Sequence, residues 1–369
     1  MKFLFSLMMV LSNSAIAQSF TLFAGSYTNT GGKGIYVYKF DVGTGKATLI
    51  STTESVNPSY LAMSPGAKYL YSVNETGGAD SGGVSAFAYD KLTGKLSFIN
   101  QQNTGGDHPC HISVDKSNQW VFVSNYTGGN ISALRINPDG SLKPYAQLIQ
   151  NSGSSIVKPN QERSHVHGSF FSPDEKYLYT TDLGIDKVLM YNVNTAATRP
   201  LTPFTTAFIE SRPGSGPRHL TFHPNGKFSY VIEELSGTVA AYAYSEGGLA
   251  PIQRISSHRS RYAGKIASAD IHVSPDGKFL YASNRGDANT IAIFSINRKT
   301  GILTSVGYQS TLGRAPRNFV IDPTGNLLLV ANQDTDNIVV FKRNKKTGRL
   351  SPSGEVIKVL RPVFLMFRR

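Results

Sequence analysis

Short apolar runs separated by polar turns follow one another along nearly the whole chain, and one of these runs recurs seven times. Each copy is rich in β-branched and aromatic residues and opens with a related cue, such as Pro109-Cys-His or Pro217-Arg-His. The spacing is roughly 50 residues, the period of one four-stranded propeller blade. The copies occupy residues 58–63, 109–114, 167–171, 217–222, 268–273, 316–321 and 362–367.

Each copy is followed by the same order of elements. A tight turn such as Ser274-Pro-Asp-Gly-Lys comes first, where proline presets one turn dihedral and glycine or asparagine accepts the next. A second strand such as 69–73, a polar loop and a third strand such as 84–89 follow. A glycine-containing hairpin then leads to an outer strand. Long helical periodicity is absent from the sequence, so the chain is predicted to be all-β.

The two ends of the chain complement each other. The first unit lacks its inner strand and opens at residues 21–27 with a segment that matches a second strand, while the last inner strand, 363–367, has no unit of its own. We therefore predict a seven-bladed β-propeller closed by the C-terminal strand, which completes the first blade and removes the exposed sheet edges. A six-bladed ring with a stray C-terminal strand is the alternative, and seven inner-strand copies favour seven blades.

The first 17 residues have the pattern of a secretory signal peptide. Lys2 precedes the apolar run 3–11, and Ala15-Ile16-Ala17 forms an A-x-A cleavage site, so domain 18–369 is predicted to be the mature propeller. The run is too short for a membrane anchor, and no cysteine follows it, so we expect no membrane association. We expect a periplasmic or secreted protein. Cys110 is the single cysteine, which excludes an internal disulfide.

The composition is that of a basic globular protein, with 40% apolar residues, 17% charged residues and a formal net charge of +13. No basic module with interleaved aromatic residues is visible, so nucleic acid is not an expected partner. Most of the lysines are expected on the solvated surface of the protein. A few arginines are instead expected to line a pocket for an anionic substrate.

Two columns of residues vary from unit to unit although the rest of the repeat is regular. Because the inner and second strands form an antiparallel hairpin, the start of one lies beside the end of the other, and both columns are expected at one mouth of the central channel. The first column, six residues before the turn proline or its equivalent Lys116, holds Ser59, Cys110, His167, Arg218, Ala269 and Arg317. The second, ten residues after it, holds Glu75, Tyr126, Leu183, Glu234, Arg285 and Gln333.

Other recurring polar positions read as structural. A loop-flanking position holds Asn74, Asn125, Asp182, Glu233, Asn284 and Asn332, which suggests hydrogen bonds from side chain to backbone. The position after the first column holds Tyr60, His111, His219, Asp270 and Asn318, for which we favour hydrogen bonds between blades.

The mouth residues fit the hydrolysis of a lactone. Water must be activated by a base, and the charge that develops on the carbonyl oxygen needs a cation or hydrogen-bond donor nearby. His167 or Glu234 could serve as the base, while Arg218 and Arg285 could stabilise the oxyanion or clamp an anionic group. The sequence contains no G-x-S-x-G elbow, Walker loop or dinucleotide fingerprint. Cys110 reads as a small core residue. His165 and His167 could share a strand face, but without clear further ligands no metal or cofactor is expected.

Several motifs in order resemble the seven-bladed propeller lactonase family, which includes 6-phosphogluconolactonases and carboxymuconate cyclases. The resemblance covers about residues 20–367, and its most specific segments are 216–224, 233–239, 269–277 and 283–285. It implies a metal-independent lactonase. In the cyclase branch a histidine, two arginines and a glutamate are proposed as catalytic, and these fall on His167, Arg218, Glu234 and Arg285.

The predicted function is therefore hydrolysis of a sugar-acid lactone of the 6-phosphogluconolactone type. His167, Arg218, Glu234 and Arg285 are the predicted catalytic residues, and Glu75, His219, Asp270 and Arg317 are predicted to bind the substrate. The alternatives are an intramolecular lyase that closes a muconate to a lactone and a non-catalytic periplasmic propeller that binds a ligand or protein. A small anionic lactone is the expected partner, and a monomer or weak oligomer the expected assembly.

Overall fold

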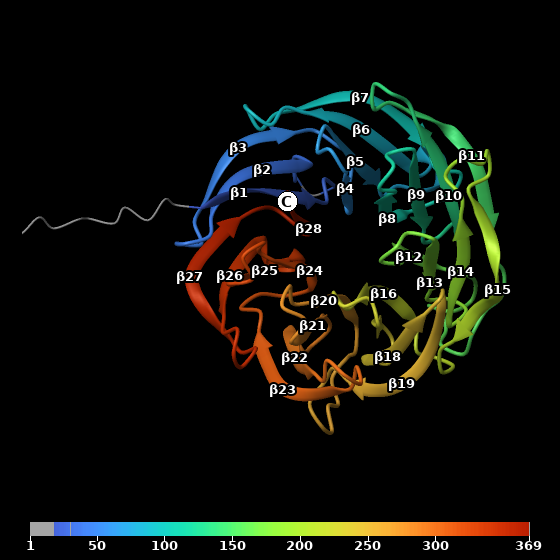
Figure 1. Ribbon diagram of the computed structural model, residues 1–369. Helices are drawn as coiled ribbons and strands as arrows, with labels where there is room; N and C mark the ends of the chain where they lie inside the picture. The colour runs from blue at the N-terminus through green and yellow to red at the C-terminus, as the bar shows by residue number, and fades with distance from the viewer. Residues whose placement is uncertain (1–17, 30, 369) are drawn as a thin grey trace, which may run out of the picture.

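The computed structural model describes residues 18–29 and 31–368 and shows seven four-stranded antiparallel sheets arranged in a ring (Figure 1). This confirms the predicted propeller. The inner strands, which surround the central channel, are β4 (Leu61–Met63), β8 (Pro109–Val114), β12 (Val166–Phe171), β16 (Pro217–Phe222), β20 (Ser268–Val273), β24 (Pro316–Ile321) and β28 (Pro362–Phe367). We call the end of the channel at which these strands begin the mouth, and name each blade after its inner strand.

The remaining strands follow outward in each blade. The second strands are β1 (Ser19–Ser26), β5 (Tyr69–Asn74), β9 (Trp120–Asn125), β13 (Tyr177–Asp182), β17 (Phe228–Glu233), β21 (Phe279–Asn284) and β25 (Leu327–Asn332). The third strands are β2 (Ile35–Asp41), β6 (Gly83–Tyr89), β10 (Asn130–Ile136), β14 (Lys187–Val193), β18 (Thr238–Ser245), β22 (Thr290–Ile296) and β26 (Asn337–Arg343). The outer strands are β3 (Ala47–Thr53), β7 (Leu96–Asn103), β11 (Leu142–Gln150), β15 (Leu201–Glu210), β19 (Gly248–Ser256), β23 (Leu303–Ser310) and β27 (Leu350–Lys358).

The first inner strand is shorter than its repeat predicts. The run 58–63 contributes only Leu61–Met63 to the ladder, because Ser59 donates its backbone N–H to Asn57 O (2.8 Å) in a local turn. Two short 3-10 helices, η1 (Gly78–Asp80) and η2 (Gln333–Thr335), lie in loops. No helix among the described residues is long and apolar enough to cross a membrane.

The hydrophobic core is divided among the interfaces between blades. Seven clusters of buried side chains are present, and each joins residues of two neighbouring blades. The second strands β9, β17, β21 and β25 are buried along their whole length because a blade covers each of their faces. Each blade therefore buries apolar side chains against both of its neighbours.

Closure is made by the C-terminal strand. β28 pairs antiparallel with β1, with Leu22 opposite Phe367 and Ala24 opposite Leu365 (Figure 1). Leu365 is 3% exposed and packs in the cluster between the β28 and β24 blades. The blade that completes the ring is therefore built from both ends of the chain, as the sequence predicts.

A single truncation in β28 tests the contribution of closure to stability. We expect Leu365→Ala to lower the free energy of unfolding by about 2–5 kcal/mol, the range for large-to-small changes in a packed core. The same substitution at Leu92, which is 97% exposed on a hairpin, should change it by less than about 0.5 kcal/mol. Denaturant unfolding measures the free energy of unfolding of both variants. A loss in Leu365→Ala as small as that in Leu92→Ala would show that β28 is not part of the cooperative core.

Candidate active site

β-Bulges at the mouth determine where most side chains of the first column lie. In the β16 blade, Pro217 pairs with Glu233 and His219 pairs with Ile232, which leaves Arg218 as an extra residue in the inner strand. Bulges re-aim side chains and are over-represented beside active sites. The same shift leaves Cys110, His167 and Arg317 as the extra residues of β8, β12 and β24. The first column thus owes its placement to a repeated backbone irregularity that the sequence repeat alone does not display.

The second column is attached to the first by a backbone hydrogen bond that recurs in every blade. The N–H of Glu234 donates to Gly216 O (2.7 Å), and that of Arg285 donates to Ala267 O (2.9 Å). In each case the acceptor lies two residues before the first-column residue. The remaining pairs are Glu75 with Asn57, Tyr126 with His108, Leu183 with His165, Gln333 with Ala315, and Tyr27 with Arg361. Both columns therefore lie around the mouth, as predicted, and Tyr27 joins the second column.

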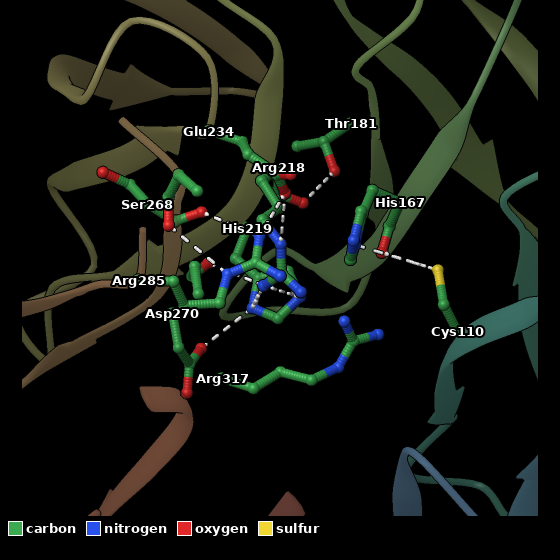
Figure 2. Close-up of polar contacts among 12 residues, drawn as sticks. Cys110, His167, Thr181, Arg218, His219, Glu234, Ser268, Asp270, Arg285 and Arg317 are labelled. Atoms are coloured by element: carbon green, nitrogen blue, oxygen red, sulfur yellow. Dashed lines mark hydrogen bonds and ion pairs between the residues drawn. The ribbon is translucent and has the colours of Figure 1, made fainter. Parts of the chain in front are cut away.

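Glu234 lies between two guanidinium groups (Figure 2). Its Oε2 is 2.8 Å from Arg218 Nε and 2.9 Å from Arg285 Nη2. The Arg218 side chain is 2% exposed and donates through Nη1 to Ala269 O (2.7 Å), whereas those of Glu234 and Arg285 are each 17% exposed. Arg218 therefore holds Glu234 from a buried position, whereas the Glu234 and Arg285 side chains are partly exposed at the mouth.

The electrostatics keep this cluster ionised near neutral pH. Burial opposes ionisation of Glu234, but Arg285, Arg218 and Arg317 outweigh it and hold its pKa below the ordinary value. Burial, together with repulsion from Arg285, lowers the pKa of Arg218 to about 10, which still leaves it charged. Both ion pairs use the same carboxylate oxygen, and Glu234 Oε1 makes no ion pair or hydrogen bond with the part of the protein described here.

His167 lies next to this cluster without an ion pair to it. Its Nδ1 is 3.8 Å from Cys110 Sγ, and its ring meets those of His219 and Tyr126 edge to face. Burial and the charge of Arg218 hold the pKa of His167 well below its ordinary value, so the imidazole is neutral near pH 7. Burial raises the pKa of the Cys110 thiol, so this cysteine is protonated and unsuited to nucleophilic attack.

A second cluster at the mouth combines Glu75, Arg317 and Tyr27. The Tyr27 hydroxyl donates to Glu75 Oε2 (2.9 Å), and Arg317 Nη2 lies 3.4 Å from the same oxygen. The Arg317 guanidinium also lies 5.5 Å from the centre of the Tyr27 ring. Figure 2 shows the Arg317 side chain reaching into the space beside His167 and His219. The mouth therefore holds two clusters in which a carboxylate is paired with arginine.

One layer below the mouth, the carboxylate of Asp270 joins three inner strands. It accepts hydrogen bonds from His219 Nδ1 (2.8 Å), His272 Nε2 (2.9 Å) and Asn318 Nδ2 (2.6 Å). Burial opposes its ionisation, but His272 and His219 outweigh this and hold the pKa of Asp270 below its ordinary value. An ionised carboxylate only accepts, so the Nδ1 of His219 carries the proton.

His219 links this layer to the mouth. Arg218 Nη1 lies 3.2 Å from its Nε2 and 3.5 Å from its Nδ1, so the guanidinium rests against the ring rather than on one nitrogen. Burial and Arg218 lower the pKa of His219 to about 4, which keeps the ring neutral under the cation. The expected hydrogen bonds between blades are present for His219, Asp270 and Asn318, and for His111, whose Nδ1 accepts from the backbone N–H of Ser169 (3.3 Å). The polar atoms of His219 and Asp270 are largely engaged by these contacts.

The histidine pair 165 and 167 does not act as a unit. The His165 ring stacks on Tyr126 at 4.4 Å, and its Nδ1 contacts Tyr126 O (2.9 Å). Within 18–29 and 31–368, no group of three or more His, Cys, Asp or Glu residues is placed to hold a metal ion.

The structure brings the four predicted catalytic residues to one side of the mouth, in the neighbouring β12, β16 and β20 blades, and places Glu75 and Arg317 at the same mouth. Tyr27 and Tyr126 were not among the predicted site residues. Tyr126 stands in the second column but is not charged. Tyr27 could have been found by continuing the second column into the first blade, where it directly follows β1.

Comparisons with known proteins agree with this architecture. Residues 21–367 match the family model described as lactonase, 7-bladed beta-propeller. The chain is 45% identical to a 6-phosphogluconolactonase of Formosa agariphila, over 89% of this chain and 94% of that protein. It is 37% identical to a 6-phosphogluconolactonase of Bacillus subtilis, over 94% and 97% of the two chains. The structure of a periplasmic gluconolactonase from Pseudomonas aeruginosa superimposes with a TM-score of 0.91 at 36% identity, covering 95% of this chain and 99% of that one.

Proposed function

This chain belongs to the seven-bladed β-propeller lactonase family, and from that premise we infer that it hydrolyses the ester bond of a sugar-acid lactone. The observation that carries this inference is the carboxylate of Glu234, held between Arg218 and Arg285 at the channel mouth. The two named relatives are 6-phosphogluconolactonases and share most of their length with this chain. The substrate class proposed is therefore an aldonolactone, phosphorylated or plain.

The charges of the mouth favour an anionic substrate or product. Arg218, Arg285 and Arg317 contribute three positive charges, and Glu234 and Glu75 contribute two negative charges, which leaves one positive charge. Hydrolysis of a lactone releases a carboxylate, and a phosphorylated lactone carries an anion from the start. Guanidinium groups bind both anions through paired hydrogen bonds. We propose that Arg285 and Arg317, the two partly exposed arginines, make these contacts.

Glu234 has the geometry of the base that orients and activates water. Its Oε2 is fixed by two arginines, and its Oε1 has no partner among the described residues. A lowered pKa makes it a weak base, which suits a strained ester that water already attacks slowly without a catalyst. Water would add to the carbonyl carbon as Glu234 takes its proton, and Arg285 would stabilise the oxyanion. Collapse of this intermediate would break the ring C–O bond, and the proton held by Glu234 would pass to the leaving hydroxyl oxygen. Neutral His167 would then hydrogen-bond the substrate beside it.

We propose a positioning role for His219 and Asp270 rather than direct contact with the substrate. Both are buried, and the Asp270 carboxylate accepts hydrogen bonds from His219, His272 and Asn318. His219 in turn supports the Arg218 guanidinium from below. These contacts fix the position of the Arg218 guanidinium where it pairs with Glu234.

We propose that residues 1–17, which lie outside the described residues, are a signal peptide and that the enzyme works in the periplasm. The A-x-A site at 15–17 supports this, as does the similarity to a periplasmic gluconolactonase. Mass spectrometry of the protein released from the periplasm should find Gln18 at the amino terminus. A chain that keeps residues 1–17 and stays with the cytoplasmic fraction would contradict this.

Replacement of Glu234 by glutamine tests its role. We expect Glu234→Gln to lower kcat for gluconolactone and 6-phosphogluconolactone by about 10²–10⁴, the typical contribution of a general base. KM for the phosphorylated lactone should not rise, because removal of the carboxylate frees two guanidinium groups to bind the anion.

Glu246→Gln is the matched control, because Glu246 is exposed in the β18–β19 hairpin at the opposite end of the blade. It should leave kcat unchanged. Hydrolysis by Glu234→Gln at the wild-type rate, measured above the spontaneous rate, would remove Glu234 from the mechanism.

A further inference from the structure

A separate cavity of about 380 Å³ lies on the mouth side of the β20 blade, outward from the ion-paired cluster. This volume is within the range of roughly 300–1,000 Å³ typical of small-molecule sites. None of the charged residues of the two mouth clusters lines it. Its lining includes His258, Tyr262, Asp287, Thr290, Tyr308 and Ser310.

One wall is formed by the link between β19 and β20, which spans 257–267 and is longer than the equivalent link 311–315 between β23 and β24. The start of this link is fixed, because Ser257 Oγ donates to Asn284 Oδ1 (2.8 Å) and Asn284 Nδ2 donates to Ser257 O (2.7 Å). The Tyr308 hydroxyl then donates to His258 O (2.7 Å). The extra length of the link is therefore held in a defined conformation over the blade.

The aromatic part of the wall is pre-organised. The rings of Tyr262 and His258 are stacked, with centroids 4.5 Å apart and planes 21° from parallel. His258 is buried, and Tyr262 is only partly covered. A third ring, that of Tyr308, comes from β23, and the Arg259 guanidinium lies 5.9 Å from its centre. The cavity therefore offers fixed aromatic surface without requiring a side chain to be ordered on binding.

The polar part of the wall has unused hydrogen-bonding capacity. Asp287 accepts from the backbone N–H of Lys265 through Oδ2 (2.8 Å), and its Oδ1 makes no hydrogen bond or ion pair with the described residues. Thr290 and Ser310 stand opposite each other where β22 and β23 meet the rim. The Thr290 hydroxyl likewise has no side-chain hydrogen bond among the residues the structure describes.

Aromatic surface beside a carboxylate and hydroxyl groups is the chemistry that recognises a sugar ring. The C–H groups on one face of a pyranose meet the electron-rich face of an aromatic ring, and its hydroxyl groups donate to carboxylate oxygens. Arg259 and Asp287 contribute opposite charges, so the cavity favours a neutral ligand over an anion. This distinguishes it from the mouth, where positive charge prevails.

The loop that follows β21 contributes residues to both the mouth and the cavity. Arg285 turns inward to Glu234 (2.9 Å), whereas Asp287, two residues later in the same loop, meets Lys265 on the other side. The Cα atoms of residues two apart are separated by at most about 7 Å. One loop thus contributes a side chain to each of the two sites.

We propose that this cavity is a subsite for a neutral pyranose ring carried as a glycosyl substituent on the lactone at the mouth. The proposal rests on the lactonase function proposed above and narrows its substrate class to lactones of disaccharide aldonic acids. In this arrangement, Tyr262 stacks on the pyranose ring, and Asp287 accepts a hydrogen bond from one of its hydroxyl groups.

The test compares gluconolactone with two glucosylated forms, cellobionolactone and maltobionolactone. In the wild-type enzyme, kcat/KM should be at least about tenfold higher for one of the glucosylated forms. Tyr262→Ala should reduce this preference to about one, whereas Tyr262→Phe, which keeps the ring, should retain it within about twofold. No preference in the wild type, or a preference that survives Tyr262→Ala, would overturn the proposal. Equal losses in Tyr262→Ala and Tyr262→Phe would exclude stacking as its basis.

A binding measurement separates this proposal from the proposed function. Absence of hydrolysis for all three lactones would count against the lactonase function and leave the cavity to be tested by ligand titration. Methyl β-D-glucopyranoside, followed by the chemical shifts of the protein, should bind the wild type and bind Tyr262→Ala at least about fivefold more weakly. Equal binding to the two proteins, or no binding to either, would overturn the subsite.

Discussion

The structure depends on one buried carboxylate in the channel. Asp270 accepts hydrogen bonds from His219 of β16 and Asn318 of β24, and Asn318 Oδ1 then accepts from the backbone N–H of Leu365 in β28 (2.8 Å). A chain of polar contacts therefore crosses four neighbouring inner strands, including the one that closes the ring. A buried charge is costly unless it is paired and hydrogen-bonded, so the blades cannot shift against one another without loss of these donors.

The same constraint positions the mouth. His219 follows Arg218, and Asn318 follows Arg317, so fixing the lower residue of each pair fixes the bulged arginine above it. The bulge recurs in most blades, and the backbone at the mouth is therefore similar from blade to blade. The chemistry differs only through the side chain that each blade places there. The β16 blade places both Arg218 and Glu234 at the mouth, whereas Leu183 of the β12 blade and Ala269 of the β20 blade carry no charge.

The sequence was sufficient to predict the propeller, its closure and the two columns, because repeats and hairpins follow from local patterns of apolar, turn and polar residues. It could not show that Arg218 and Arg285 share one oxygen of Glu234, since that depends on the rotation of neighbouring blades. Tyr27 was missed because its blade is assembled from both chain ends. The cavity beside Tyr262 was missed because the link 257–267 differs in length from the equivalent links of other blades, such as 311–315. The catalytic roles of the mouth residues stay predictions.

A crystal structure of the protein with 6-phosphogluconate, the hydrolysis product of the phosphorylated lactone, would show whether the channel mouth is the active site. We expect the carboxylate of this product within hydrogen-bond distance of Arg285, near Glu234 Oε1, and its phosphate toward Arg317. A product molecule bound elsewhere on the propeller, with no contact to Arg285, Glu234 or Arg317, would contradict the assignment of the mouth as the active site.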